Sequence, residues 1–195
     1  MIRWQLPVLK EVRAHIDGGA IGGSAIKALG LPPPLFDSRP EAHVGAVGTQ
    51  LAELYGALLD IARREGRLRR GQPLCERWTL TYDIYSPKLK CFIEVDERQH
   101  FSKPRLDWIQ RTPRPIYPTY FWEEALPGLV RAPARDRDPA HRDEQRAYRD
   151  ACRDLLPIVY GFGRTLRLDE FTLRYNHPAI ADLLRQVVAG HEVWR

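Results

Sequence analysis

The sequence predicts an α/β domain with a mixed central sheet, in which an antiparallel hairpin is flanked by helices. Apolar residues recur at helical spacing over residues 41–65, alternate at a spacing of two over residues 78–96, and return to helical spacing over residues 140–155. Since each of these segments has one apolar face to bury, we expect them to share a core.

The first helix is expected over residues 41–65. Its apolar side chains recur at steps of three and four residues, which places on one face Val44, Val47, Leu51, Leu54, Leu58 and Ile61. Gly66 then ends the pattern, because glycine is common directly after a helix. The proline-rich stretch from Leu31 to Pro40 must be extended or turning. Residues 1–40 are interpreted as an appendage to the core.

The next two elements are interpreted as the strands of a hairpin. Trp78–Tyr85 and Leu89–Asp96 both alternate and are rich in β-branched and aromatic residues. The segment Ser86-Pro87-Lys88 between them supplies a turn.

The hairpin determines which acidic side chains share a face. Side chains alternate along a strand, so Glu94 and Asp96 lie on the same face. A loop of two or four residues places Asp83 opposite Phe92, and therefore diagonal to Glu94. A loop of three residues would put Asp83 opposite Cys91 and separate it from Glu94.

The rest of the chain completes the core. Residues 104–120 hold four prolines and are expected to be irregular, with one helical turn near Leu106–Gln110. The remaining elements are a helix over 140–155, short strands at Ile158–Tyr160 and Thr165–Leu168, and a helix at Ile180–Ala189. The core is therefore expected over residues 41–170, with residues 171–195 as a helical segment packed on it.

Acidic side chains on one face of a sheet indicate a cation site. The carboxylates of Asp83, Glu94 and Asp96 would repel one another, and a hard divalent ion such as Mg²⁺ removes this penalty. Replacing one of them with alanine is then expected to leave folding nearly intact. The alternative is a solvated sheet face on which the acids pair with nearby basic residues, namely Lys88, Lys90 and Arg98.

The order of these residues resembles a known pattern. Tyr82–Pro87 followed by Phe92–His100 is similar to the core of the very-short-patch-repair-like branch of the PD-(D/E)xK nucleases. That branch has an aspartate, a turn with proline, an apolar strand ending in Glu-x-Asp, and a histidine shortly afterwards. The resemblance covers roughly residues 41–170 and implies a restriction-endonuclease-like fold.

The resemblance implies roles for four residues of the hairpin. Asp83 and Glu94 match the two carboxylates that bind Mg²⁺ or Mn²⁺, and the backbone carbonyl of Val95 matches the third ligand. Asp96 stands where the wider superfamily has its lysine, and this position is also acidic in the resembling branch. The activity implied is hydrolysis of DNA phosphodiester bonds.

Just past the strand, the resemblance implies a polar pair. Gln99 and His100 match it, and His100 would act as a general base or orient the attacking water. Glu97 replaces the usual glycine, which puts the turn geometry in question. With the lysine missing, Lys90 or Lys103 is a candidate to replace its charge.

The helix expected over residues 140–155 predicts a nucleic-acid contact. A stripe of arginines spaced by four, three and four residues consists of Arg142, Arg146, Arg149 and Arg153. Facing outward, it would grip phosphates. The opposite face has small and apolar residues that can pack on the sheet. The alternative is a solvated helix whose arginines pair with Asp143, Asp150 and Asp154.

Composition bounds the remaining expectations. The net charge of +5 is compatible with an anionic partner such as DNA. The three cysteines are widely spaced, no leader peptide is evident and no long apolar run occurs, so a cytoplasmic protein without a membrane span is expected. The alternative function is an inactive module that binds nucleic acid or a partner protein, and a homodimer stays open.

Overall fold

The computed structural model describes residues 20–21, 37–86, 91–111, 139–162 and 165–169. Contacts divide the chain into two compact units, each described here by itself. The sheet unit combines Met1–Pro32, Thr81–Glu97 and Pro157–Arg195, and the helical unit combines Pro33–Leu80 and Arg98–Leu156. The predicted boundaries at residues 40 and 170 stay predictions, because most of residues 1–40 and all of residues 171–195 lie outside the described ranges.

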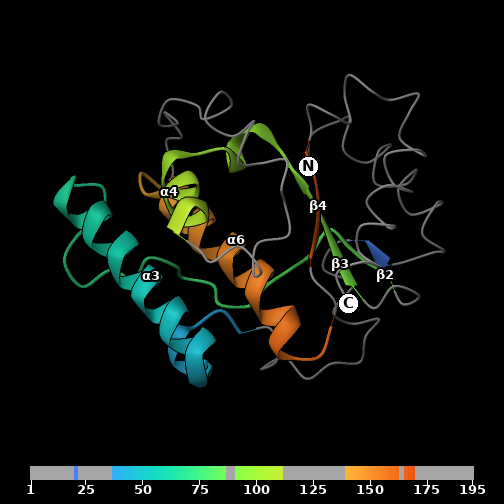
Figure 1. The fold of residues 1–195 in the computed structure, drawn as a ribbon. Coiled ribbons are helices and arrows are strands. Elements are labelled where there is room, and N and C mark those ends of the chain that lie inside the picture. The colour runs from blue at the N-terminus through green and yellow to red at the C-terminus, as the bar shows by residue number, and fades with distance from the viewer. Residues whose placement is uncertain (1–19, 22–36, 87–90, 112–138, 163–164, 170–195) are drawn as a thin grey trace. The chain divides into compact units, whose positions relative to one another are not determined.

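The sheet unit contains a mixed sheet of four strands in the order β1-β2-β3-β4. These strands are β1 (Ala20–Ile21), β2 (Ile84–Ser86), β3 (Cys91–Asp96) and β4 (Leu166–Asp169). β2 runs antiparallel to both β1 and β3. β4 lies parallel to β3 and beside it (Figure 1). β1 is a strand that the sequence pattern did not indicate, since glycines flank it on both sides.

The register of the hairpin differs from the predicted one. Ser86 pairs with Cys91 and Ile84 pairs with Ile93. The predicted registers paired Asp83 with Phe92 and were wrong by two residues. A shift by an even number keeps each side chain of the strand on its face, but β2 begins at Ile84, so the ladder does not reach Asp83.

The predicted strand Trp78–Tyr85 is wrong over most of its length. Only Ile84 and Tyr85 of that range pair with a neighbouring strand, although the burial alternates, with Leu80 and Tyr82 buried and Thr79 exposed. Thr79 instead forms an isolated bridge with Asp37. Alternation predicts which side chains are buried, but a strand also needs a partner for its backbone.

Strand β3 is buried on both faces. Ile93 and Val95 are buried on one face, and Phe92 is fully buried on the other, where Glu94 and Asp96 follow it. The rings around Phe92 belong to Tyr82, Tyr85 and Phe162, with centroids 4.0, 5.1 and 5.4 Å away. The alternative of a solvated acidic face is therefore wrong for Glu94 and Asp96.

The helical unit is built on α3 (Gly45–Arg64), α4 (Lys103–Arg111) and α6 (Arg142–Val159), the last of which belongs to this unit up to Leu156. Short 3₁₀ turns, η2 (Pro40–Ala42) and η3 (Arg98–His100), precede α3 and α4. The predicted first helix is confirmed, but Val44 of its predicted apolar face precedes it and is 92% exposed. It begins at Gly45, and its buried residues include Leu51, Leu54 and Leu58 of the predicted face.

Hydrogen bonds tie the chain after α3 to the helices. The amide of Gln145 donates to the carbonyl of Leu74 at 2.8 Å, and the N–H of Leu74 donates to the hydroxyl of Tyr55 at 2.9 Å. Tyr148, fully buried, donates its hydroxyl to the carbonyl of Ser38 at 2.5 Å. These bonds satisfy backbone groups of segments that belong to no helix or sheet.

Two further elements differ from the predicted ones. The single turn expected near Leu106–Gln110 is the full helix α4, because Pro104 stands in its first turn, where a missing N–H costs little. The strand expected at Ile158–Tyr160 is wrong, because α6 continues through Pro157 to Val159.

The helix expected at Ile180–Ala189 lies outside the described residues. No helix in the described ranges is long and apolar enough to cross a membrane.

Candidate functional site

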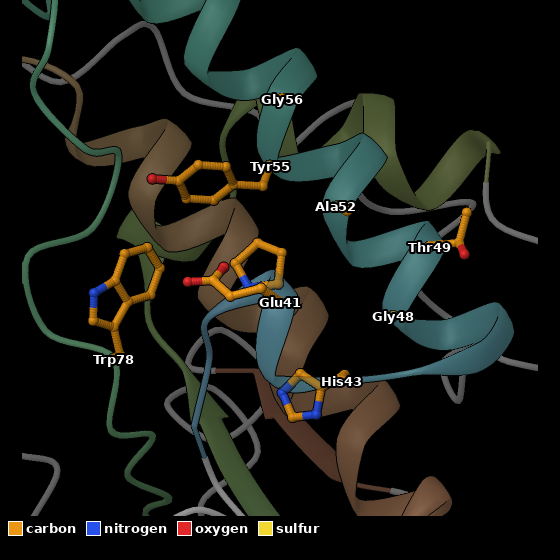
Figure 2. Close-up of a pocket in the computed structure, with 9 residues that line it drawn as sticks. Glu41, His43, Gly48, Thr49, Ala52, Tyr55, Gly56 and Trp78 are labelled. Atoms are coloured by element: carbon orange, nitrogen blue, oxygen red, sulfur yellow. The ribbon is translucent and has the colours of Figure 1, made fainter.

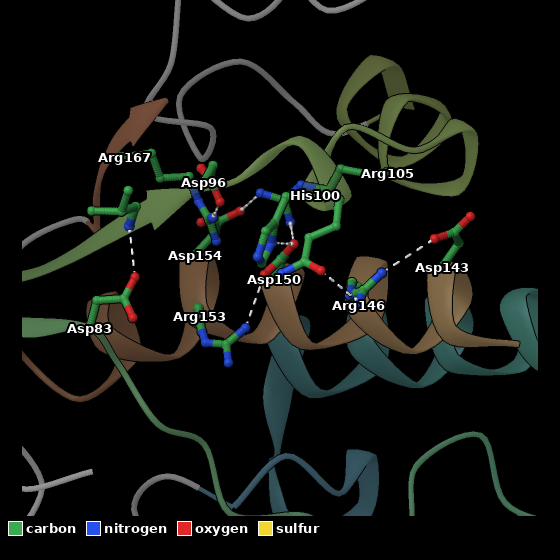
Figure 3. Close-up of polar contacts among 12 residues, drawn as sticks. Asp83, Asp96, His100, Arg105, Asp143, Arg146, Asp150, Arg153, Asp154 and Arg167 are labelled. Carbon is green, nitrogen blue, oxygen red and sulfur yellow. Dashed lines mark hydrogen bonds and ion pairs between the residues drawn. The ribbon is translucent and has the colours of Figure 1, made fainter. Parts of the chain in front are cut away.

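Two hydrogen bonds join Asp83, just before β2 begins, to Glu94 and Val95 of β3. The backbone N–H of Asp83 donates to Oε1 of Glu94 at 2.9 Å. Oδ2 of Asp83 accepts from the backbone N–H of Val95, also at 2.9 Å (Figure 3). β2 does not extend to Asp83, so these two bonds to carboxylates stand in place of the backbone hydrogen bonds of a sheet. Each carboxylate is held against a backbone N–H of the opposite segment.

The donor set beside Asp83 fits a hard divalent cation. In a strand, the N–H and the C=O of one residue point to the same edge. Because the Val95 N–H reaches Asp83, the Val95 carbonyl faces the edge where Asp83 lies. Two carboxylates and a carbonyl are the oxygen ligands that Mg²⁺ and Mn²⁺ take.

Asp96 has a basic partner on the parallel strand. Its Oδ1 accepts from Nη1 of Arg167 at 2.5 Å, and both side chains are fully buried (Figure 3). In the register, Arg167 lies opposite Glu94, so its charge stands among the acids of that face. A buried carboxylate is strongly destabilising unless paired, and this pair supplies the partner.

Arg167 is the functional candidate that the sequence pattern missed. The sequence offered Lys90 or Lys103 as the residue that would replace the charge of the superfamily lysine. Lys103 is an exposed residue of the helical unit that contacts Asp107, and Lys90 lies outside the described residues. The available signal was an arginine inside the apolar strand Thr165–Leu168. Recognising it required the pairing of β4 with β3.

The helical unit contains a cavity of about 240 Å³, which we call the arginine cavity. It is lined by Gln99, His100, Arg142, Gln145, Arg146, Arg149 and Arg153. The four arginines were predicted as an outward stripe, but they are only partly exposed and line the cavity together with the predicted pair Gln99 and His100.

Hydrogen bonds hold the arginines of this cavity in place. Nη2 of Arg146 donates to Oε1 of Gln99 at 2.9 Å, and Nη2 of Arg149 donates to the carbonyl of Arg77 at 2.8 Å. Nη1 of Arg153 donates to Asp150 at 2.9 Å. The predicted alternative of Arg–Asp pairs on α6 is thus also found in part.

A buried ion-pair network lies behind the cavity. Nδ1 of His100 is 2.8 Å from Oδ2 of the fully buried Asp150 (Figure 3). Since an ionised carboxylate only accepts, Nδ1 is the donor of this bond. Arg105, also fully buried, donates to Asp154 at 2.9 Å and lies 3.9 Å from Asp150. The network fixes the orientation of the His100 ring.

A second cavity of about 590 Å³ lies beside α3 in the helical unit. Figure 2 shows the rings of Tyr55 and Trp78 on one side of it, with Glu41 and His43 nearby. The centroids of the two rings are 5.7 Å apart. No residue predicted for function lines this cavity.

The described cysteine side chains do not form a nucleophilic site. Cys75 and Cys152 are free and buried. Burial raises the pKa of both thiols, so the reactive thiolate form is disfavoured.

The predicted site residues thus fall into two groups. Asp83, Glu94, Val95 and Asp96 lie together in the sheet unit, whereas Gln99, His100 and the four arginines meet in the helical unit. No protein family model, curated protein or solved structure matches this chain. The resemblance to PD-(D/E)xK nucleases therefore stays a prediction from the residues.

Proposed function

We propose that the protein is a metal-dependent nuclease that hydrolyses DNA phosphodiester bonds, with Asp83 and Glu94 as its metal ligands. The observation that carries the proposal is the pair of hydrogen bonds that join Asp83 to Glu94 and Val95. These bonds keep both carboxylates near Val95, at the same edge of β3, before any ligand binds. A site that needs little rearrangement loses little entropy when it binds an ion.

The ion expected here is Mg²⁺ or Mn²⁺, held by Asp83, Glu94 and the carbonyl of Val95. When bound, such an ion polarises a phosphodiester and lowers the pKa of a bound water. In the proposal, Asp96 acts indirectly by holding Arg167, whose positive charge replaces that of the absent lysine.

Residues of the helical unit have supporting roles in the proposal. His100, whose ring is oriented through Nδ1 by Asp150, is the general base in the proposal. Gln99 holds Arg146, one of the arginines that would contact DNA phosphates. Each phosphate contact made by these arginines makes the negative slope of log K against log salt concentration steeper by about 0.9.

The test uses plasmid DNA with Mg²⁺ or Mn²⁺ and the substitutions Asp83→Asn and Glu94→Gln. These changes keep an oxygen acceptor for each backbone N–H but remove the charge that binds metal. We expect the cleavage rate to fall at least about 100-fold. Asp60→Asn, at an exposed position of α3, is the matched control and should cleave normally. Undiminished cleavage by Asp83→Asn contradicts the proposal.

Thermal unfolding gives a readout independent of activity. Metal at about 100 times its dissociation constant stabilises the folded state by about 2.7 kcal/mol, or about 5–10 °C in a chain of this size. We expect this shift in the wild type and in Asp60→Asn, and none in Asp83→Asn.

The second candidate is a module that binds nucleic acid or a partner protein without catalysis. The observation that favours it is that Glu94, Asp83 and Asp96 already have hydrogen-bonding partners within the protein. Such a protein would bind DNA through the arginine cavity, yet would neither gain stability from Mg²⁺ nor cleave. The thermal measurement separates the two candidates.

A further inference from the structure

We infer that the arginine cavity binds the terminal phosphate monoester of a nucleic acid strand. The inference concerns binding by residues of the helical unit and requires no cleavage. It rests on the proposed function only in taking nucleic acid as the molecule that carries the phosphate.

The lining of the cavity is rich in positive charge. Among the described residues, it contains four arginines, one histidine and no carboxylate. Behind the lining, Arg105 adds a fifth arginine, and the acids that contact these arginines include Asp143, Asp150 and Asp154. A phosphate monoester carries about −1.5 to −2 at pH 7, whereas an internal diester carries only one negative charge.

The arginines of the cavity are preorganised. The side chains of Arg146 and Arg153 are only 16% and 14% exposed, and hydrogen bonds to Gln99 and Asp150 fix their guanidinium groups. Arg149 is fixed by the carbonyl of Arg77. Arginine normally loses much rotamer freedom when it binds an anion, and this loss is reduced where the side chain is already held.

The size of the cavity favours the end of a strand. Its volume of about 240 Å³ lies below the roughly 300–1,000 Å³ of clefts that enclose drug-sized ligands. It therefore suits a single phosphate group. A phosphate inside a strand continues in both directions and would have to loop to enter, whereas a terminal phosphate enters directly.

Fluorescence anisotropy with a short single-stranded DNA tests the inference. The same oligonucleotide, labelled internally, carries a 5′-phosphate, a 3′-phosphate or hydroxyls at both ends, and the buffer contains EDTA. Because no metal is present, a failed nuclease proposal cannot affect the result. Since hydrogen bonds to charged groups contribute strongly, we expect one phosphorylated end to bind at least about tenfold tighter than the hydroxyl strand. Equal binding of all three oligonucleotides overturns the inference.

Competition identifies the source of the phosphate. Inorganic phosphate and a nucleoside 5′-monophosphate should each compete at least about tenfold more weakly than the phosphorylated strand, because the strand adds backbone contacts. If either competes as well as the phosphorylated strand, the cavity binds a small phosphate and the assignment to a strand end is wrong.

Two variants of the cavity are compared with one outside it. Arg146→Gln and Arg149→Gln should reduce the preference for the phosphorylated end to less than about threefold, since each removes a charged donor. Arg70→Gln removes the same charge from an exposed position outside the lining and should keep the preference. Circular dichroism checks that all variants are folded. A preference that persists in both cavity variants overturns the inference.

Discussion

Replacing Asp83 with alanine removes the acceptor of the Val95 backbone N–H. Val95 is only 3% exposed, so water is poorly placed to replace the lost oxygen. Replacing Asp83 with asparagine keeps an oxygen at the same distance along the side chain and removes only the charge. The pair of substitutions therefore separates the hydrogen bond from the charge of this residue.

The hydrogen bond reverses the expectation from charge alone. Relief of repulsion among acids predicted that alanine would leave folding nearly intact. A buried donor left without a partner costs about 1–3 kcal/mol, so we expect Asp83→Ala to destabilise the protein by about 2 kcal/mol. Asp83→Asn exchanges a charged acceptor for a neutral one and should cost about 1 kcal/mol. In a chain of this size these values lower Tm by about 4–8 °C and about 2–4 °C.

The assay is urea denaturation in EDTA, combined with hydrogen exchange at the Val95 amide. The amide should exchange slowly in the wild type and in Asp83→Asn, and about thirtyfold faster in Asp83→Ala, as 2 kcal/mol implies. Asp60→Ala, at an exposed position, should stay within about 0.5 kcal/mol of the wild type. Unchanged stability and unchanged exchange in Asp83→Ala would refute the role of this bond.

Two further predictions concern the helical unit. A Cβ at Gly48 would lie 2.3 Å from the carbonyl oxygen of His43, whereas a Cβ at Gly56 meets open space. In urea titrations, Gly48→Ala should therefore lose about 1–3 kcal/mol and Gly56→Ala should gain up to about 1 kcal/mol from helix propensity; equal effects would contradict the packing. Burial raises the pKa of Glu144, although Arg67 opposes the shift. Ionisation of this carboxyl therefore opposes folding. The wild type should lose stability relative to Glu144→Gln as the pH rises past 4.5, the ordinary pKa of a glutamate. Unfolding free energies at pH 4 and pH 7 measure this change, and a constant difference between the two proteins would count against it.

Local patterns in the sequence determined the direction of side chains. The steps of three and four residues placed Leu51, Leu54 and Leu58 on the buried face of α3. The alternation around the hairpin predicted that Asp83 and Glu94 are neighbours, and the bond from the Asp83 N–H to Glu94 brings them together despite an error of two residues in the register. Both results depend only on the periods of helix and strand, which are properties of a few consecutive residues.

Tertiary structure decided which groups these side chains meet. Arg167 pairs with Asp96 across 71 positions of sequence, and Arg146 meets Gln99 across 47. Neither pair follows from a local period, because a period gives the face of a side chain and not the element that packs against it. The partner is fixed only when distant segments pack together and each buried charge must find an opposite charge. For that reason the sequence indicated acids and an arginine stripe, whereas the paired arginine of β4 and the arginine cavity emerged only from the folded chain.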